Sequence, residues 1–583
     1  MEYGELAEVY NKLEGTAKRL EKTSIISGLL KKTDSDELSA IMLLLQGRIY
    51  PPWDERKIGV ASRLVLKAIN IASGVDAVEI EEEWKQSGDL GLTAEKIISS
   101  KKQITLFSAS LDIKKVFDNF VKLASMEGEG SVDQKVKLIA ELLTSARPLE
   151  AKYIVRTVLE DLRVGVGEGS VRDAIVWAFL YPVEYNKEEN DIQLSDESRA
   201  EYNKCVDALQ EAYDITNDFS EVAVIAREKG IDGLQNISLE IGRPIKVMLY
   251  QKAKDMEDAF EIVGRPAILQ YKYDGFRMQL HREGHKIRLF TRRLENVTKQ
   301  FPDVVEVIRN HIKSSNYILD AEIIGIDPKT GKWLAFQNIS QRIKRKYGIH
   351  QMAKDIPVMV NIFDAMQVNG ENIVKKPYSK RIELVKKITS EIPEKLQLAK
   401  EIITEDVKEA EKFYNKSLDL GNEGIMVKAL DKPYRPGSRV GYGVKVKPVM
   451  ETLDLVIVGA DWGEGKRANW LSSFTIACKS GDKFLEIGKV GTGIKEKDEE
   501  GISFGQLTSM LKPIIISEKG KEVAVKPSVI IEVNYEEIQA SPTYGSGFAL
   551  RFPRLVRLRE DKALDEVSDI SLVKELYEKQ RGR

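Results

Sequence analysis

One lysine in this chain lies in a setting that suits nucleophilic chemistry. Lys272 opens the string KYDGFR at the end of a β-rich run, a turn through Asp274 and Gly275 follows, and Arg277 opens the next run. A lysine amine attacks only when it is unprotonated, and its ordinary pKa is about 10.4, so the site must supply burial or neighbouring cations that lower the pKa. Taken alone, the string is also compatible with a hairpin that carries a surface lysine.

Further strings downstream supply other parts of nucleotide chemistry, and each falls on an expected strand or turn. In LDAEIIG, Asp320 and Glu322 are two residues apart, so on a strand both side chains face the same side of the sheet. The other strings are TRRLEN with Arg292, NIFDAM with Phe363 and Asp364, NEGIMVKA with Glu423 and Lys428, and GVKVKP with Lys445 and Lys447. Further cations, several carboxylates and one flat aromatic face suited to a base thus follow Lys272 along the chain.

These strings, together with RLREDK near the C-terminus, resemble the motifs of the covalent nucleotidyltransferase superfamily. Within it, the chain is most similar to the archaeal and eukaryotic replicative type of ATP-dependent DNA ligase, and the resemblance covers nearly the whole chain. It implies that Lys272 attacks the α-phosphate of ATP and forms lysyl-AMP. The AMP would then pass to the 5′-phosphate of a nick in duplex DNA, and the 3′-hydroxyl would displace it.

The resemblance also implies the residues that hold the nucleotide. Arg277 and Arg292 would contact ribose and phosphate oxygens, and Phe363 would stack on adenine. Lys445 and Lys447 would clamp the α-phosphate, and their charge would help to lower the pKa of the nucleophile.

Carboxylates in the same strings are the expected metal ligands. By resemblance Glu322 and Glu423 would hold Mg²⁺ or Mn²⁺, and Glu322 would also belong to the nucleotide site. For Asp320 and Asp364 a structural role, as strand-end residues bonded to backbone, is an equal alternative.

The string RLREDK contributes Arg559, Asp561 and Lys562 near the end of the third segment. In the family this motif moves over the nucleotide and orients the pyrophosphate leaving group, so the domain that bears it must act as a lid. A solvated charged run is the alternative for the string alone. The preceding match, SGFALRFPRLVR, favours the motif.

A glycine-rich segment in the N-terminal part is the candidate DNA contact. Arg163, Gly165, Gly167 and Gly169 precede a helix expected to begin at Ser170. Glycines let backbone N–H groups approach phosphate, and a helix N-terminus favours anions, although a flexible turn between helices has the same composition. The segment resembles the family's DNA-binding domain, which grips the minor groove across a nick.

The string KKQITLFSAS places Gln103, Leu106 and Phe107 at the spacing of a sliding-clamp-binding peptide. Such a peptide presents a short apolar anchor to a pocket on its partner. Burial of Leu106 and Phe107 in the core is the alternative.

The chain departs from the family at two positions. Gln270 stands two residues before the lysine, where the ligases usually carry Glu, and Gly443 stands where an aromatic residue usually precedes Lys445. If the Gln270 amide can flip, it satisfies either the amino group of adenine or the carbonyl of guanine, so we expect weaker discrimination against GTP.

Three domains are expected in the 583 residues. Apolar spacing of three and four predicts an all-α DNA-binding domain over residues 1–235. Short β-rich runs with turn signals predict an α/β nucleotidyltransferase (adenylation) domain built on antiparallel sheets over 236–450, with helices at about 300–313 and 378–391. Residues 451–583 read as a β-barrel OB-fold domain with a short helix near 503–511 and a C-terminal helix.

Composition sets limits on partners and compartment. The 89 basic and 91 acidic residues give a net charge of −2, so any DNA site must be a local patch. Two cysteines, Cys205 and Cys478, argue for a reducing compartment and against a four-cysteine zinc module. With no signal peptide and no long apolar run, we expect a cytoplasmic monomer without a membrane segment.

The function expected from these features is the sealing of 5′-phosphate/3′-hydroxyl nicks in replication, repair and recombination. An RNA ligase or a capping guanylyltransferase would share the lysine and the sheet, but neither typically carries the helical domain with RVGVGEGS. A catalytically inactive DNA-binding scaffold on a clamp is the other alternative. The joint presence of Lys272, Glu322, Glu423, Lys445 and Lys447 argues against it.

Overall fold

A computed structural model describes residues 1–54, 56–100, 110–126, 128, 130–334, 336–343, 345, 347–438, 441–448, 451–463, 467 and 469–580. The chain forms two compact units that each combine distant segments of sequence. The first comprises Met1–Tyr250, Gly275–Ala399 and Leu430–Val440, and the second comprises Gln251–Asp274, Lys400–Ala429 and Gly441–Arg583.

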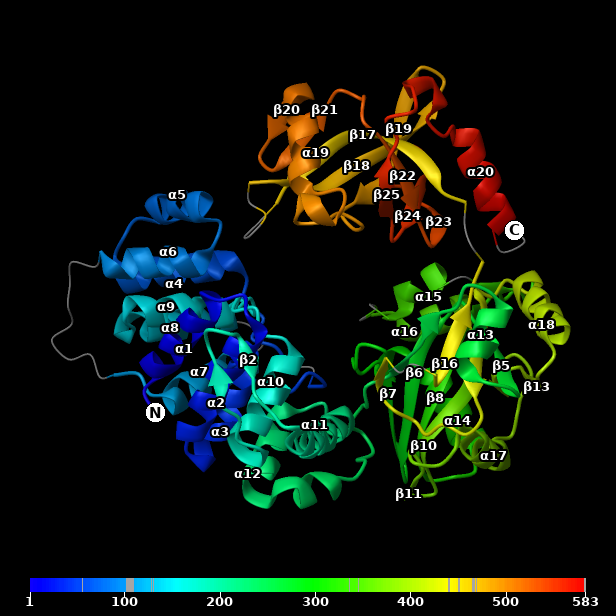
Figure 1. The fold of residues 1–583 in the computed structure, drawn as a ribbon, viewed down its shortest axis with the longest axis horizontal. Helices are drawn as coiled ribbons and strands as arrows, with labels where there is room; N and C mark the ends of the chain where they lie inside the picture. The colour runs from blue at the N-terminus through cyan, green and yellow to red at the C-terminus, as the bar shows by residue number, and fades with distance from the viewer. Residues whose placement is uncertain are drawn as a thin grey trace. The chain divides into compact units, whose positions relative to one another are not determined.

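The N-terminal part of the first unit is helical, as the apolar spacing predicts (Figure 1). In α7, for example, Val116, Phe120 and Leu123 are buried at spacings of three and four, and the side chain of Asp112 caps the helix. The helices are α1 (Tyr3–Glu14), α2 (Arg19–Lys32), α3 (Ser35–Leu44), α4 (Ser62–Ser73), α5 (Ala77–Ser87), α6 (Leu90–Ser99), α7 (Ile113–Ser125), α8 (Ser131–Ser145), α9 (Pro148–Val158), α10 (Glu168–Ile175), α11 (Asp196–Thr216) and α12 (Phe219–Gln235).

Two short features interrupt this helical part. A π-helical turn, Val176–Leu180, follows α10 directly. The two-residue strands β1 (Tyr185–Asn186) and β2 (Asp191–Ile192) then pair antiparallel.

The rest of the first unit is built around a mostly antiparallel sheet of order β11-β10-β8-β6-β7, with β8 between β6 and β10 (Figure 1). Its strands are β6 (Phe276–Glu283), β7 (Lys286–Thr291), β8 (Asn316–Ile326), β9 (Trp333–Leu334), β10 (Val358–Val368), β11 (Glu371–Asn372) and β12 (Leu396–Leu398). The helices are α14 (Pro302–His311), α15 (Phe336–Ile343), α16 (Ile349–Asp355) and α17 (Tyr378–Ile388), and β3 (Met248–Leu249) pairs with β15 (Gly437–Ser438).

The second unit contains a five-stranded sheet of order β13-β5-β14-β16-β4. Its strands are β4 (Gln251–Lys252), β5 (Ala267–Lys272), β13 (Glu401–Thr404), β14 (Gly424–Ala429) and β16 (Gly443–Val446). Helix α13 (Met256–Val263) packs near β16, and α18 (Val407–Asp419) packs near β14.

The same unit ends in the expected barrel. In it β17 pairs with β18, β21 and β22, and β25 pairs with β22. The elements are β17 (Leu453–Trp462), β18 (Leu471–Ser480), β19 (Lys483–Val490), α19 (Phe504–Leu511), β20 (Ile515–Lys519), β21 (Glu522–Val525), β22 (Ile530–Asn534), β23 (Glu537–Ala540), β24 (Phe548–Arg551), β25 (Arg554–Leu558) and α20 (Ile570–Lys579).

These elements confirm the predicted fold class, a helical part, an α/β nucleotidyltransferase part and an OB-fold barrel. Two details of the sequence-based expectation were wrong. Three strand pairs are parallel rather than antiparallel: β10–β12, β15–β3 and β16–β4. Each pairs over only two or three residues, which is too short for the sequence pattern to indicate strand direction. Helices α13, α15, α16 and α18 were not predicted. The division at residues 235 and 450 stays a prediction.

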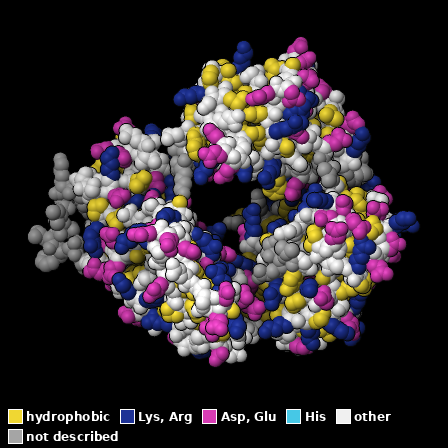
Figure 2. Space-filling model, viewed as in Figure 1, with side chains coloured by type: hydrophobic (Ala, Val, Ile, Leu, Met, Phe, Trp, Pro, Cys, Tyr) yellow, Lys and Arg dark blue, Asp and Glu magenta, His cyan; other side chains and the backbone are white. Residues whose placement is uncertain are grey.

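The surface and the cysteines agree with the composition. Basic and acidic side chains are interspersed over the face shown in Figure 2. Cys205 and Cys478 are both buried free thiols. Across the described residues, no helix is both long and apolar enough to cross a membrane.

Candidate active site

Lys272 lies at the end of β5, on a sheet face that carries several other polar side chains. Residues directly opposite each other in an antiparallel pair share a face, as do residues two apart on one strand. Gln270 is opposite Glu401 on β13 and Met426 on β14, and Met426 is opposite Lys445 on β16. One face of the sheet therefore displays Lys272, Gln270, Glu401 and Lys445 together.

Glu423 joins two lysines of this site. Its Oε2 lies 2.9 Å from Nζ of Lys272 and 2.5 Å from Nζ of Lys447, and its side chain is 13% exposed. Burial acts to raise the pKa of the Glu423 carboxyl, but attraction to Lys272 and Lys447 outweighs burial, so the pKa lies well below its usual range. The backbone N–H of Glu423 also donates to the carbonyl of Lys272 at 2.9 Å, which fixes the two residues side by side.

Lys445 completes the cationic cluster. Its pKa is lowered by burial first, and then by the positive charges of Lys447 and Lys272. Three lysines lie near Glu423, and a second carboxylate, Glu536, is 3.9 Å from Nζ of Lys447. Cations still outnumber these two carboxylates, so the site suits an anionic group.

The glycine of KYDGFR has a packing role. A Cβ placed on Gly275 would lie 2.2 Å from the carbonyl oxygen of Ile323 on β8, far inside contact distance. Only a residue without a side chain lets the turn that follows Lys272 meet β8.

Arg277 is held by protein groups of the first unit. Its Nε donates to Asp320 Oδ1 at 2.8 Å, its Nη2 bonds Asp320 Oδ2, and its Nη1 donates to the carbonyl of Met248 at 2.9 Å. Burial acts to lower the pKa of Arg277, but attraction to Asp320 raises it above its ordinary value. The guanidinium lies 5.2 Å from the ring centre of Phe363. Arg277 therefore supports the aromatic face, and its contact with a nucleotide stays a prediction.

Glu322 and Phe363 are partly exposed positions on mostly buried strands. Glu322 is opposite Arg277 on β6 and Asn361 on β10, so the three share a face. Phe363 falls at a register shift in β10, between Ile362 and Asp364, and it is partly exposed where its strand neighbours are buried.

Asp320 and Asp364, for which a structural role was an equal alternative, both bind arginine side chains. Asp320 is fully buried against Arg277, and Asp364 binds Arg381 through both carboxylate oxygens at 2.8 and 2.9 Å. The structural alternative is thus favoured, with arginine side chains rather than backbone as the main partners.

The two barrel cations converge on an aspartate at the start of β17. Asp454 accepts from Nη1 of Arg559 at 2.7 and 2.9 Å, and its Oδ2 lies 2.8 Å from Nζ of Lys562. Nε and Nη2 of Arg559 donate to Asp561 at 2.9 and 2.8 Å. Most donors of Arg559 are therefore engaged within the barrel, whereas Lys562 makes one ion pair to Asp454.

The glycine-rich segment is a loop held by contacts to side chains outside it. Gly165 has φ +62°, and the ammonium of Lys22 bonds the carbonyls of Val164 and Gly165 at 2.6 and 2.9 Å. Arg163 pairs with Asp161 at 2.6 Å and Asp89 at 3.3 Å. Helix α10 begins at Glu168 rather than at Ser170, with Gly167 as its N-cap.

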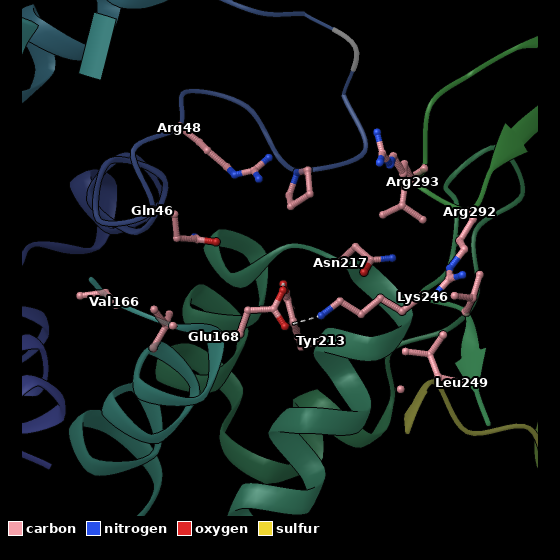
Figure 3. Close-up of a pocket in the computed structure, with 16 residues that line it drawn as sticks. Gln46, Arg48, Val166, Glu168, Tyr213, Asn217, Lys246, Leu249, Arg292 and Arg293 are labelled. Carbon is pink, nitrogen blue, oxygen red and sulfur yellow. Dashed lines mark hydrogen bonds and ion pairs between the residues drawn. The ribbon is translucent and has the colours of Figure 1, made fainter. Parts of the chain in front are cut away.

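A cavity of about 660 Å³ in the first unit adjoins this loop (Figure 3). Gly167 lines it together with Arg48, Lys246, Arg292 and Arg293. The structure thus brings Gly167, a predicted DNA contact, and Arg292, a predicted nucleotide contact, to one basic cavity. Figure 3 shows the ion pair between Glu168 and Lys246 across it, at 2.6 Å.

The remaining predicted residues are placed as follows. Gly169 belongs to the first turn of α10. The segment with Gln103, Leu106 and Phe107 lies outside the described residues. Lys272, Gln270, Glu423, Lys445, Lys447, Arg559 and Lys562 belong to the second unit, and Arg277, Arg292, Glu322 and Phe363 belong to the first.

Three residues with evident partners in these sites were not found from the sequence. Glu401 bonds Gln270, Asp454 binds the barrel cations, and Lys246 faces the basic cavity. None of them lies within a recognisable string, and each meets its partner only through the fold.

Comparison with known protein families covers the chain in three matches. The pattern described as ATP dependent DNA ligase domain matches residues 247–447. The pattern for the DNA ligase N terminus matches residues 2–176, and that for the ATP dependent DNA ligase C terminal region matches residues 467–562.

Full-length relatives and a solved structure agree with these matches. The DNA ligase of Nanoarchaeum equitans is 48% identical, over 100% of this chain and 99% of the relative. The DNA ligase of Thermococcus onnurineus is 42% identical, over 99% and 98%. A solved structure named Pmar-Lig_PreS3 has a TM-score of 0.57 at 16% identity over 95% of this chain and 99% of that chain, which supports the fold.

The fold joins a helical part, an α/β part and a barrel, and the candidate site gathers Lys272, Lys445 and Lys447 near Glu423. The chain belongs to the ATP-dependent DNA ligase family.

Proposed function

We propose that this ligase seals 5′-phosphate/3′-hydroxyl nicks in duplex DNA through lysyl-AMP on Lys272. The observation that supports this assignment best is the cluster in which Lys272 and Lys447 share Glu423 and Lys445 lies close by on the same sheet. A triphosphate brings its own negative charge to these cations, and the amine of Lys272 is then adjacent to the α-phosphate.

The reaction would proceed in three transfers. The unprotonated amine of Lys272 attacks the α-phosphate of ATP, a P–N bond forms, and the bond to pyrophosphate breaks. The 5′-phosphate oxygen of the nick then attacks the same phosphorus and releases the lysine. The 3′-hydroxyl finally attacks the 5′-phosphate and expels AMP. Lys445 and Lys447 would hold the α-phosphate and stabilise its charge in each step.

Glu322 and Glu423 would hold a divalent cation. Within the described residues, no group of three or more His, Cys, Asp or Glu side chains is arranged as a metal site. Two separate carboxylates fit Mg²⁺ or Mn²⁺, which keep several waters and share phosphate oxygens. When bound, the ion would supply charge neutralisation at the phosphates.

DNA contact is proposed for the glycine-rich loop and the cavity beside it. The N–H groups near Gly167 and the N-terminus of α10 suit phosphate, and Arg48, Lys246, Arg292 and Arg293 give the cavity a basic lining. Sliding-clamp binding by Gln103, Leu106 and Phe107, action as a monomer and a cytoplasmic location remain parts of the same proposal.

The decisive experiment separates the first step from the others. The protein is incubated with α-labelled ATP, and then with nicked duplex DNA carrying a 5′-phosphate. We expect covalent label on the protein, chased by the nick into sealed DNA. Label that moves only onto nicked RNA would favour an RNA ligase, and absence of label would favour an inactive scaffold.

A further inference from the structure

The basic cavity of the first unit contains a carboxylate of the protein itself. Arg48, Lys246, Arg292 and Arg293 line the cavity, and Glu168 is the single acidic residue among the described residues of its lining. Oε2 of Glu168 lies 2.6 Å from Nζ of Lys246. Four cations against one carboxylate leave the cavity positive, and a positive cavity attracts anions.

Tyr213 holds both members of this ion pair (Figure 3). Its hydroxyl donates to Oε1 of Glu168 at 2.9 Å, and Nζ of Lys246 lies 4.2 Å from the centre of its ring. Tyr213 is 2% exposed, and its ring stacks on Phe219 with the ring centres 3.5 Å apart. Lys246 therefore keeps a cation–π contact with a buried ring when Glu168 turns away, and its ammonium stays in the cavity.

The ion pair between Glu168 and Lys246 is easily opened. The side chain of Glu168 is 62% exposed and that of Lys246 is 25% exposed. Water and salt screen the attraction between charges in such positions, and exposed ion pairs contribute little stability. Glu168 offers one carboxylate, whereas duplex DNA brings closely spaced phosphates that can meet several cations of the cavity at once. DNA is therefore the stronger ligand for Lys246.

We propose that Glu168 takes the place of a DNA backbone phosphate at Lys246 and leaves it when duplex DNA binds in the cavity. In the complex a phosphate oxygen accepts from the ammonium of Lys246, and the ring of Tyr213 keeps the lysine in position. Because the ion pair must open first, Glu168 lowers the affinity for DNA. The inference rests on the proposed DNA contact at this cavity and adds the internal competitor that controls it.

The test measures the dissociation constant of a nicked duplex with a 3′-dideoxy end, which cannot be sealed. The variants are Glu168→Gln, Lys246→Met and the double variant that combines them. Tyr213→Phe removes one hydrogen bond to Glu168 and leaves every charge in place. Glu197→Gln is the matched control for net charge, since Glu197 is an exposed residue in the first turn of α11 and lies outside the cavity lining. Thermal melting of each variant reports folding.

Glu168→Gln should tighten DNA binding by about 2- to 5-fold, the range that corresponds to one exposed ion pair. Tyr213→Phe should act in the same direction, and Glu197→Gln should have little effect. Lys246→Met should weaken binding and reduce the slope of log affinity against log salt concentration by about 1. In the Lys246→Met background, Glu168→Gln should bring little gain, because no ammonium remains to be released.

An equal gain from Glu168→Gln in both backgrounds would indicate general repulsion of DNA by the carboxylate and would overturn the inference. Unchanged or weaker binding by Glu168→Gln at the wild-type melting temperature would overturn it as well. If Glu168→Gln melts at a lower temperature, the direction of the change in Tyr213→Phe decides. All these outcomes leave the proposed function standing, because lysyl-AMP formation and nick sealing by wild type test that function separately.

Unchanged affinity and salt slope in Lys246→Met would overturn both the inference and the proposed DNA contact at the cavity.

Discussion

His281 should make the protein sensitive to mild acid. It lies in β6, fully buried, and burial lowers its pKa from 6.5 to about 3, with a further contribution from Arg288. Its Nδ1 accepts a hydrogen bond from the N–H of Gly242 at 3.0 Å, so the neutral tautomer carries its proton on Nε2, beside Gln279. Protonation of Nδ1 would place its N–H against the N–H of Gly242, and the hydrogen bond between them would be lost.

The sign and size follow from proton linkage. Below pH 6.5 the unfolded chain takes up a proton at this residue, whereas the folded protein does not until pH nears 3. Stability from neutral His281 is therefore fully present above pH 6.5 and is lost as the pH falls. At about 1.36 kcal/mol per pKa unit, the loss is about 2 kcal/mol by pH 5 and nearly 5 kcal/mol at the limit.

The assay measures unfolding in urea at several pH values from 7.5 to 5 for wild type and His281→Gln. Glutamine keeps a carbonyl acceptor for Gly242 and does not titrate. The free energy of unfolding of wild type, minus that of His281→Gln, should be about 2 kcal/mol smaller at pH 5 than at pH 7.5. Hydrogen exchange at the imidazole C2 position, followed by mass spectrometry, reports the His281 pKa directly. Parallel pH profiles of the two proteins would refute the reasoning.

Three further predictions concern the reaction and its partners. Lys272→Ala should abolish labelling by ATP, while binding of nicked DNA stays nearly intact, because we propose the DNA contacts at the glycine-rich loop and the basic cavity; retained covalent AMP would exclude this nucleophile. Replacing Arg559 and Lys562 together by Ala should slow lysyl-AMP formation by about 10²-fold or more, and sealing of a pre-adenylated nick far less. Equal losses in both steps would indicate a structural or DNA-binding role. Gln103→Ala with Phe107→Ala should weaken clamp pull-down without lowering ligation of a short nicked duplex, and a lowered melting temperature would instead favour burial of these residues.

The sequence was most informative where function fixes both residue type and spacing. Strands β5, β6 and β8 follow the predicted runs closely, and Lys272, Glu423 and Lys447 do meet. Helix α18 was missed although Val407, Ala410 and Phe413 recur at helical spacing in its sequence, so the pattern was present and was overlooked.

The residues that bind the predicted site residues could not be predicted from the sequence. Glu401 is 131 residues from Gln270, and Asp454 is 105 residues from Arg559, so strand pairing alone brings them together. The N-terminus of α10 was misplaced because Gly167 caps the helix without a side-chain hydrogen bond, where the usual rule points to Ser170.

Gly275 bears on how such sequences are compared. Because its position cannot hold a side chain against Ile323, the glycine of the lysine motif is a requirement of strand packing rather than of chemistry. A descendant that lost the reactive lysine would still be held to the glycine by its architecture. In this chain the glycine therefore reports on the fold, whereas the predicted activity depends on Lys272 with its carboxylate and cationic neighbours.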